Sequence, residues 1–243
     1  MLQRAYRFLY QFFLILVFFP LTLCCGVVSY IAGFFDRHGN HAHRCLIYWA
    51  RACLALAGLE VRIRGLERID PESAYVFMPN HASFLDILLV FAYIPHNFRI
   101  IVKQEIFSIP FLGLATRSSG QIPLDRKSPS RGLKSLRRAA DLLRQGVSIV
   151  VFPEGTRTLD GRIQDFKATL FTLPIRAQVP VVPVLIEGTF QALRRGSVLL
   201  EPSTVTMTFY DPVSSEPFND RDRKNYAEKV RQVLSGFEPG SAS

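Results

Sequence analysis

The stretch VSIVVFPEGTR, residues 147–157, decides the fold class. It holds an almost continuous apolar run, Val147–Phe152, that leads directly into the polar turn Pro153–Arg157. Such a run, with little polar alternation, is typical of a strand buried on both faces, as in a parallel sheet covered by helices. The stretch therefore predicts a central strand whose carboxyl end carries polar side chains.

Outward from this stretch, short β-rich runs alternate with helical runs. The β-rich runs are Glu60–Arg64, Tyr75–Met78, Phe98–Val102, Val181–Ile186 and Val205–Phe209. The helical runs are Phe84–Tyr93, Pro129–Leu143, Phe166–Leu173 and Arg221–Leu234. This alternation predicts an α/β fold, with a mostly parallel twisted sheet flanked by helices, over residues 59–212. Pro180 and Pro183 favour an edge position or a bulge at the start of one strand. Residues 213–243 are expected to form a C-terminal helix and a frayed tail.

The composition limits the class of protein. Of the 243 residues, 49% are hydrophobic, which excludes a disordered chain. Four cysteines in a chain of this length do not make a disulfide framework, which indicates a reducing environment. The 29 Lys and Arg residues exceed the 20 Asp and Glu residues and leave a net charge of +9.

An apolar segment precedes the predicted sheet. Phe8–Phe35 has 28 residues without a charged side chain, and as a straight helix it would be about 42 Å long, beyond a bilayer core of roughly 30 Å. Pro20 interrupts the run, so a kinked, tilted span and two shorter helices within one leaflet are both open. Cys45–Leu59 is expected to be an interfacial helix. Residues 1–58 are thus predicted to form a membrane anchor, with the remaining chain on the cytoplasmic face.

Two polar motifs follow directly on predicted strands. PNHASFLD, residues 79–86, follows Tyr75–Met78, and PEGTR, residues 153–157, follows Val147–Phe152. Open α/β sheets bind their ligands at the edge formed by the carboxyl ends of the strands. Although about seventy residues separate the two motifs, the predicted fold can bring them together.

His81 and Asp86 form a candidate acid–base pair in the first motif. On one regular helix they would point about 140° apart. They can meet only if Ser83 is the N-cap and His81 lies in the loop that enters the helix. Asp86 could then hold the imidazole tautomer and leave the other ring nitrogen free to accept a proton. A plain capping box between Ser83 and Asp86 is the alternative. Ser83 as a nucleophile is the weaker interpretation, because the chain has no G-x-S-x-G motif.

The second motif combines a turn that has little side-chain bulk at Gly155 with a cation, Arg157. The guanidinium of Arg157 suits a phosphate because its donors form a planar fork. Glu154 is expected to orient an arginine or to accept a hydroxyl proton. The alternative for these residues is a surface turn with a salt bridge.

Together the motifs resemble those of the lysophosphatidic acid acyltransferase family, the 1-acylglycerol-3-phosphate O-acyltransferases. The resemblance covers roughly residues 60–190, and no single block would be specific. The matching blocks, in chain order, are Asn80-His81 to Asp86 (N-H-x4-D), Lys103–Ile106 with Pro110 and Gly113, Gly120–Arg126, Phe152–Arg157 with Phe166-Lys167, and Val179–Val184. One departure is Ala168-Thr169, where the family usually has a glycine soon after the F-K pair.

The resemblance implies an enzyme that moves a fatty acyl group from acyl-CoA or acyl-carrier protein to the sn-2 hydroxyl of 1-acylglycerol 3-phosphate, giving phosphatidic acid. It assigns the general base to His81, steadied by Asp86, and needs no metal or redox cofactor. The residues expected to bind substrate are Lys103, Arg126, Glu154, Gly155, Thr156 and Arg157. There are two alternatives. The enzyme could use another lysolipid as acceptor, or the chain could be a noncatalytic membrane protein that binds anionic lipid.

Two other polar clusters have less specific interpretations. Asp36, His38, His41 and His43 are interpreted as a polar loop at the membrane boundary rather than a metal site. Arg126–Arg144 holds seven cations and one acid, Asp141, with Leu133, Leu136, Ala140 and Leu143 on one helical stripe. A solvated surface helix is one interpretation of this segment, and a binding face for anionic lipid headgroups or a phosphorylated acyl donor is the other. Nucleic acid is not an expected partner, because few aromatic residues lie among the cations.

Overall fold

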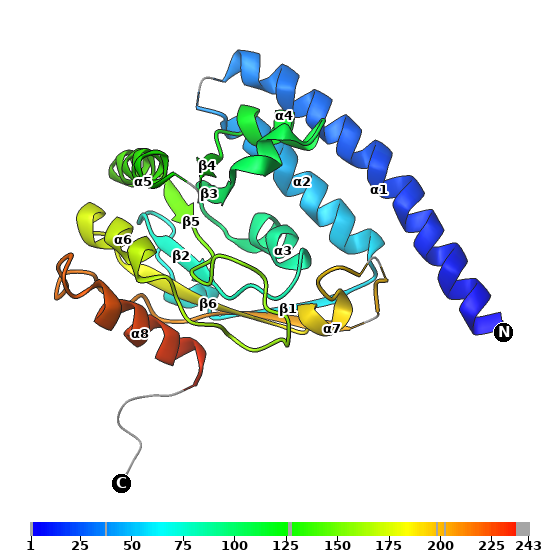
Figure 1. Cartoon of the computed structure of the whole chain (residues 1–243). Coiled ribbons are helices and arrows are strands. Elements are labelled where there is room, and N and C mark those ends of the chain that lie inside the picture. The colour runs from blue at the N-terminus through cyan, green and yellow to red at the C-terminus, as the bar shows by residue number, and fades with distance from the viewer. Residues whose placement is uncertain (1, 37, 126–127, 198, 202, 237–243) are drawn as a thin grey trace, which may run out of the picture.

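A computed structural model of the chain describes residues 2–36, 38–125, 128–197, 199–201 and 203–236, with side chains left undescribed at 2–15 and 129. The described residues form a seven-stranded sheet in the order β1-β7-β6-β2-β5-β3-β4 (Figure 1). The strands are β1 Glu60–Arg64, β2 Val76–Pro79, β3 Phe98–Lys103, β4 Ile122–Leu124, β5 Ser148–Val150, β6 Val181–Glu187 and β7 Thr204–Phe209. All neighbouring pairs in this order are parallel except β6 and β7, so the predicted mostly parallel α/β sheet is confirmed.

Helices cover both faces of the sheet. The α-helices are α1 Leu2–Phe35, α2 Asn40–Leu56, α3 Leu85–Tyr93, α4 Leu112–Ser118, α5 Pro129–Arg144, α6 Thr172–Ala177, α7 Thr189–Ala192 and α8 Arg223–Leu234. The 3-10 turns are η1 Leu66–Arg68, η2 Gln104–Ser108 and η3 Ala168–Phe171. Figure 1 shows α1 to α4 on one side of the sheet and α5, α6 and α8 on the other.

The core has two halves, one on each face of the sheet. Along β2, Phe77 packs on the side of α2 and α3, whereas Val76 and Met78 pack on the side of α5, α6 and α8. All three side chains are fully buried. A strand with both faces covered has no solvent side, which explains why the apolar runs read from the sequence lack alternation.

Two features of the sheet differ from the sequence prediction. The edge strand β4 was not predicted, because it has only three residues and contains Pro123. An edge strand tolerates this proline, since one side of it needs no partner. The prolines do not put the start of β6 at an edge, because β6 lies between β2 and β7. The alternative, a bulge, is present: Val184–Glu187 pair with β7 in one register, whereas Val181 bridges Val213, which leaves one extra residue on the β7 side. On β6 the pairing with β7 begins at Val184, which lies opposite Phe209. The Pro183 carbonyl accepts a bond from Tyr210 N, so the side of Pro183 that lacks an N–H faces the end of β7.

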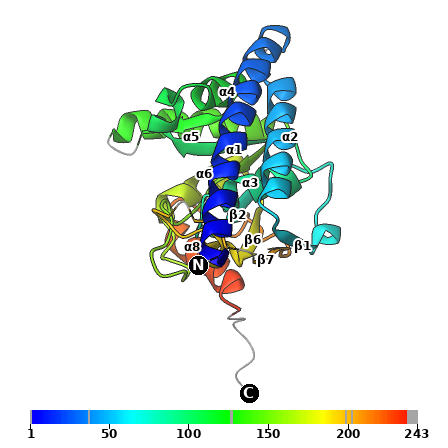
Figure 2. The ribbon, with the colours of Figure 1, turned by 90° about the vertical axis from the view of Figure 1, so that its right-hand side faces the viewer.

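The N-terminal segment is one continuous helix. Pro20 lies inside α1, so the alternative of two separate helices over Phe8–Phe35 is wrong. Leu16–Phe35 is long and apolar enough to cross a membrane by length and composition, and 17% of it is buried. Its exposed apolar side chains are Leu16, Phe18, Phe19, Val27, Val28, Tyr30, Ile31, Phe34 and Phe35. In Figure 2 α1 lies along the outer side of the molecule, beside α2 and α4.

Two glycines allow α1 to approach α4 closely. A Cβ added at Gly26 would lie 2.6 Å from the carbonyl oxygen of Phe111, and one at Gly33 would lie 3.1 Å from Cβ of Ser118. The partners, like the glycines, are seven residues apart, so the two helices meet at successive contacts. The indole nitrogen of Trp49 on α2 also donates to Thr22 Oγ1 of α1, at 3.2 Å. The second half of α1 is therefore docked on the domain.

The loop between α1 and α2 is bonded to the sheet. Asp36 caps α2 by accepting bonds from the N–H groups of His38 and His41. The buried guanidinium of Arg99 on β3 donates to the His38 carbonyl at 2.6 Å and to Asn40 Oδ1 at 2.8 Å. Residues of α2 also share a hydrophobic core with α3. The predicted boundary between a membrane anchor and an acyltransferase domain, at residues 58 and 59, stays a prediction. Part of the predicted tail, 237–243, lies outside the described residues.

Candidate active site

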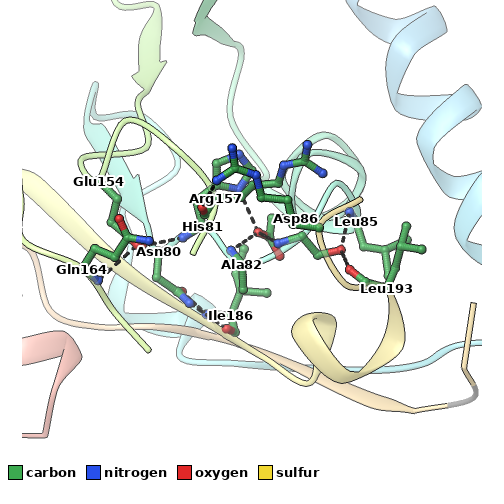
Figure 3. A network of polar contacts seen from close by, with 12 residues as sticks. Asn80, His81, Ala82, Leu85, Asp86, Glu154, Arg157, Gln164, Ile186 and Leu193 are labelled. Atoms are coloured by element: carbon green, nitrogen blue, oxygen red, sulfur yellow. Dashed lines mark hydrogen bonds and ion pairs between the residues drawn. The ribbon is translucent and has the colours of Figure 1, made fainter. Parts of the chain in front are cut away.

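The two polar motifs begin side by side. β2 and β5 are hydrogen-bonded neighbours, with Phe77 opposite Val150, and each motif follows the carboxyl end of its strand. Asn80, the first side chain beyond β2, links this end to β6 on the other side. Its Nδ2 donates to the Ile186 carbonyl at 2.9 Å and its Oδ1 accepts from the Ile186 N–H at 2.7 Å (Figure 3). The loop that carries His81 is thus held between two strands.

His81 and Asp86 lie in direct contact. The distance from His81 Nδ1 to Asp86 Oδ2 is 2.9 Å, and the same oxygen accepts the N–H groups of Ala82 and Ser83 at 2.7 Å each (Figure 3). Asp86 is the second residue of α3 and its side chain is 0% exposed. The N-cap of α3 is Phe84, so the prediction of Ser83 as the N-cap is wrong by one residue. The bond from Ser83 N to Asp86 is the one that a capping box would contain, and it shares its oxygen with the contact to His81.

The geometry leaves one imidazole nitrogen for chemistry. A carboxylate only accepts hydrogen bonds, so Nδ1 of His81 carries the proton and Nε2 keeps its lone pair. The ring is stacked on Phe152, with centroids 4.1 Å apart, and the side chain is 13% exposed. Ser83 is fully buried and its hydroxyl donates to the Leu193 carbonyl at 2.7 Å, which argues against its role as a nucleophile.

Glu154 bonds main-chain groups of both loops. Its Oε1 accepts the His81 N–H at 2.7 Å, and its Oε2 accepts the Gln164 N–H at 3.1 Å. The expected partners, an arginine or a hydroxyl, differ from those observed. The pKa of Glu154 is raised to about 7, mainly by burial; the two N–H bonds lower it and the charge of Asp86 raises it. Glu154 therefore positions the backbone of His81.

The turn after Glu154 is hydrogen-bonded to the main-chain carbonyl of His81. Thr158 N donates to the His81 carbonyl at 2.9 Å, so both main-chain groups of His81 are bonded to the second motif. Gly155 is buried with a φ of +72°, a conformation that glycine adopts without strain. Thr156 is exposed and Arg157 is half-buried.

Two cations at this turn, Lys167 and Arg195, were not predicted from the sequence as site residues. A Cβ added at Gly155 would lie 2.8 Å from Nζ of Lys167, so the lysine occupies the space that a side chain would fill. Arg195 donates from Nη1 to the Arg157 carbonyl at 3.1 Å. Lys167 could have been found as the basic residue of the F-K pair. Arg195 could not, since it lies in the loop after α7, far along the chain.

Of the remaining predicted cations, Lys103 is farther along the same edge. Lys103 is the last residue of β3, one strand beyond β5, and its ammonium pairs with Glu105 at 3.2 Å. Its side chain is about half exposed. Arg126 lies outside the described residues. Among the described residues, no group of three or more His, Cys, Asp and Glu side chains could hold a metal ion.

Comparison with known proteins identifies the family. The Acyltransferase family model matches residues 60–187, more than half of the chain. The chain belongs to this family. Its relatives include "1-acyl-sn-glycerol-3-phosphate acyltransferase" of Cocos nucifera, 28% identical over 84% of this chain and 65% of the relative. The chloroplastic enzyme of that activity, LPAT1, from Arabidopsis thaliana is 36% identical over 63% of this chain and 44% of the relative. The chain thus spans less than two thirds of these relatives.

A solved structure has the same fold over the whole chain. The crystal structure of the 1-acyl-sn-glycerophosphate (LPA) acyltransferase PlsC from Thermotoga maritima matches with a TM-score of 0.79 and 25% identity. The match covers 100% of this chain and 98% of the other. Within this acyltransferase, the segment matched by the family runs from β1 to the end of β6 and contains all predicted site residues. Arg195 lies beyond it.

Proposed function

We propose that this acyltransferase moves a fatty acyl group from a thioester to the sn-2 hydroxyl of 1-acylglycerol 3-phosphate, giving phosphatidic acid. The names of its relatives support this acceptor. The observation that carries the proposal is the His81–Asp86 contact, which leaves Nε2 of His81 as a proton acceptor at the carboxyl edge of the sheet. No nucleophilic side chain is needed, because a thiol with a pKa of roughly 8.5 is a good leaving group.

His81 acts twice in this reaction. Its Nε2 takes the proton of the sn-2 hydroxyl as the hydroxyl oxygen attacks the thioester carbonyl carbon, and buried Asp86 stabilises the imidazolium that forms. When the carbon–sulfur bond breaks, the imidazolium returns the proton to the leaving thiolate. A positioned base contributes about 10²–10⁴ to the rate. The stacking of Phe152 and the main-chain bonds to Glu154 and Thr158 hold the ring in this orientation.

The phosphate of the acceptor requires cations close to His81. Only a few covalent bonds separate the sn-2 oxygen from the phosphorus, so the phosphate site must lie beside the base. Arg157 belongs to the turn that is bonded to His81, Lys167 lies beside Gly155 of that turn, and Arg195 bonds the main-chain carbonyl of Arg157. Arginine and lysine are the side chains that bind phosphate most strongly. Lys103 and Arg126 remain candidates by resemblance.

We further propose that the protein works at a membrane, with α1 lying in one leaflet and the catalytic domain on the cytoplasmic face. The exposed apolar side chains of Leu16–Phe35 would contact lipid. This half of α1 is packed on α2 and α4 of the catalytic domain through Trp49, Gly26 and Gly33, so a spanning orientation would draw these helices into the bilayer with it. An in-plane helix keeps these contacts and brings the active site near the headgroups.

An acceptor panel tests the activity. The full-length protein in detergent is given a palmitoyl thioester with 1-acylglycerol 3-phosphate, a monoacylglycerol or lysophosphatidylcholine. We expect turnover with the first and at least about a hundredfold less with the second, which lacks the phosphate. His81→Ala should abolish turnover, while His41→Ala, at a histidine that is 58% exposed, should not. Equal turnover of all acceptors would overturn the assignment of the substrate, and vesicle binding without any turnover would favour the noncatalytic alternative.

A further inference from the structure

The outer face of α5 carries a row of cations that the proposed reaction does not use. These side chains are exposed: Arg131, Lys134, Arg137, Arg138 and Arg144. The opposite face is fixed in the core through Ala139, Ala140 and Leu143, each less than 9% exposed. The row extends over 14 residues, Arg131 to Arg144, or about 20 Å of helix, which is longer than one phosphate or one nucleotide.

Most of this charge is not neutralised locally. Arg144 pairs with Asp141 at 2.6 Å, and Arg131 pairs with Asp125 at 3.0 Å. Among the described residues, no carboxylate forms an ion pair with Lys134, Arg137 or Arg138. Like charges on one helix face repel each other, so an anionic partner would relieve this repulsion.

A groove runs beside the cations, between α5 and α6. It has a volume of about 330 Å³. Its apolar lining includes Leu133, which is 40% exposed, together with Leu136 and Leu173. Its polar lining includes Arg137, Asp141, Arg144 and Arg176. Arg144 pairs with Asp141 and Arg176 pairs with Asp220, which leaves Arg137 as the lining cation without an ion pair among the described residues. An apolar floor between cations fits a helix that is apolar on one side and acidic on its flanks.

The position of α5 argues for a soluble partner rather than a lipid surface. α5 and α6 cover the face of the sheet opposite to α2 and α3, outside which α1 exposes its apolar side chains (Figure 1). One bilayer cannot lie flat against both faces. At the same time, α5 begins shortly after β4 ends, so its first turn lies at the sheet edge that also holds His81. β4 is three strands from β2 in the sheet, about 14 Å at the usual strand spacing.

We propose that the exposed face of α5, with the groove between α5 and α6, docks an acidic acyl-carrier protein that supplies the acyl thioester. The inference rests on the proposed acyl transfer and specifies its donor. A carrier seated there would present an anionic helix to Lys134 and Arg137, and its flexible pantetheine arm would reach over the carboxyl edge to His81. The phosphates of a nucleotide-borne thioester are clustered at one end of the molecule, so they would contact fewer of these cations than an acidic protein helix does.

Charge reversal on α5 tests the proposal in the full-length enzyme. The variant Lys134→Glu/Arg137→Glu is compared with Arg223→Glu/Lys224→Glu, which reverses one lysine and one arginine on the exposed side of α8, on the same face of the sheet. Palmitoyl-acyl-carrier protein and palmitoyl-CoA serve as donors, each with 1-acylglycerol 3-phosphate. We expect the α5 variant to raise KM for the carrier-borne donor by about tenfold or more and to change KM for palmitoyl-CoA by less than about twofold. The α8 variant should change neither.

The other outcomes overturn the proposal. Equal loss with both donors would make the α5 cations structural, and no change with either donor would exclude the face as a docking site. Turnover of palmitoyl-CoA alone by the unaltered enzyme would exclude a carrier protein as donor while leaving the acyl transfer intact. If the α5 variant lost only its binding to vesicles of phosphatidylglycerol and phosphatidylcholine, the face would bind lipid. No turnover with any donor would instead refute the proposed function itself.

Discussion

Replacement of Asp86 by asparagine tests the central contact of the site. Asparagine has nearly the same shape, and its amide oxygen can take the position of Oδ2 and accept the N–H groups of Ala82 and Ser83. The amide nitrogen then occupies the position of Oδ1, which has no hydrogen-bond partner among the described residues. The change therefore removes the charge beside His81 and keeps the loop.

The size of the effect follows from the distance. Two unit charges 2.9 Å apart attract by about 1.4 kcal/mol at a dielectric constant near 80 and by about 6 kcal/mol near 20. Since each 1.36 kcal/mol changes a rate tenfold, the imidazolium loses a stabilisation worth about tenfold to about ten-thousandfold. Asp86 is fully buried, so the upper part of this range applies. We expect kcat/KM to fall by about 10²–10⁴.

The assay follows release of the thiol from palmitoyl-CoA at a fixed concentration of 1-acylglycerol 3-phosphate. Weaker bonds to Ala82 and Ser83 cost about 1–2 kcal/mol of unfolding free energy, so Tm should fall by roughly 2–8 °C and the variant stays folded at 25 °C. Asp211→Asn, at a carboxylate that is 80% exposed and paired with Arg68, is the matched control. If Asp86→Asn kept kcat/KM within about threefold of the unaltered chain, the role of Asp86 beside His81 would be refuted.

Three further predictions concern positions around the site and the N-terminal helix. Because burial raises the pKa of Glu154 from 4.5 to about 7, the folded state binds more protons than the unfolded state in this window, so stability falls as pH rises. Glu154→Gln should flatten this part of the Tm–pH curve, and parallel curves would contradict it. Gly155→Ala and Gly146→Ala both place alanine at positive φ, at a cost of about 1 kcal/mol each, but only the first meets Lys167. Only the first should raise KM for 1-acylglycerol 3-phosphate, by several-fold, and an equal rise in both would exclude displacement of the lysine as the cause. Gly26→Leu should lower Tm by detaching α1 from α4 without weakening vesicle binding, and an unchanged Tm would disprove this packing.

Local patterns account for much of the agreement between sequence and structure. All six predicted strands are present, because long apolar runs and their turns are properties of a few adjacent residues. The helix predicted over Phe166–Leu173 is displaced: it begins as the 3-10 turn η3 and continues as α6 to Ala177. Pro20 does not end the helix, although the sequence left this open. The helix α1 continues through it and packs on α2 and α4.

The sequence alone specified the residues of the catalytic pair and of the turn beside it. The order of the His81 and Glu154 motifs, each after an apolar strand, was enough to predict that they lie at one edge, since parallel strands end there together. Only the tertiary structure decided which groups they bind. Glu154 contacts main-chain N–H groups, Lys167 fills the space beside Gly155, and α5 lies across the sheet from α1. Every residue except proline has a main-chain N–H, so a bond to one leaves no pattern in the sequence. The side of the sheet on which a helix packs depends on all the other elements, so a local stretch of sequence does not reveal it either.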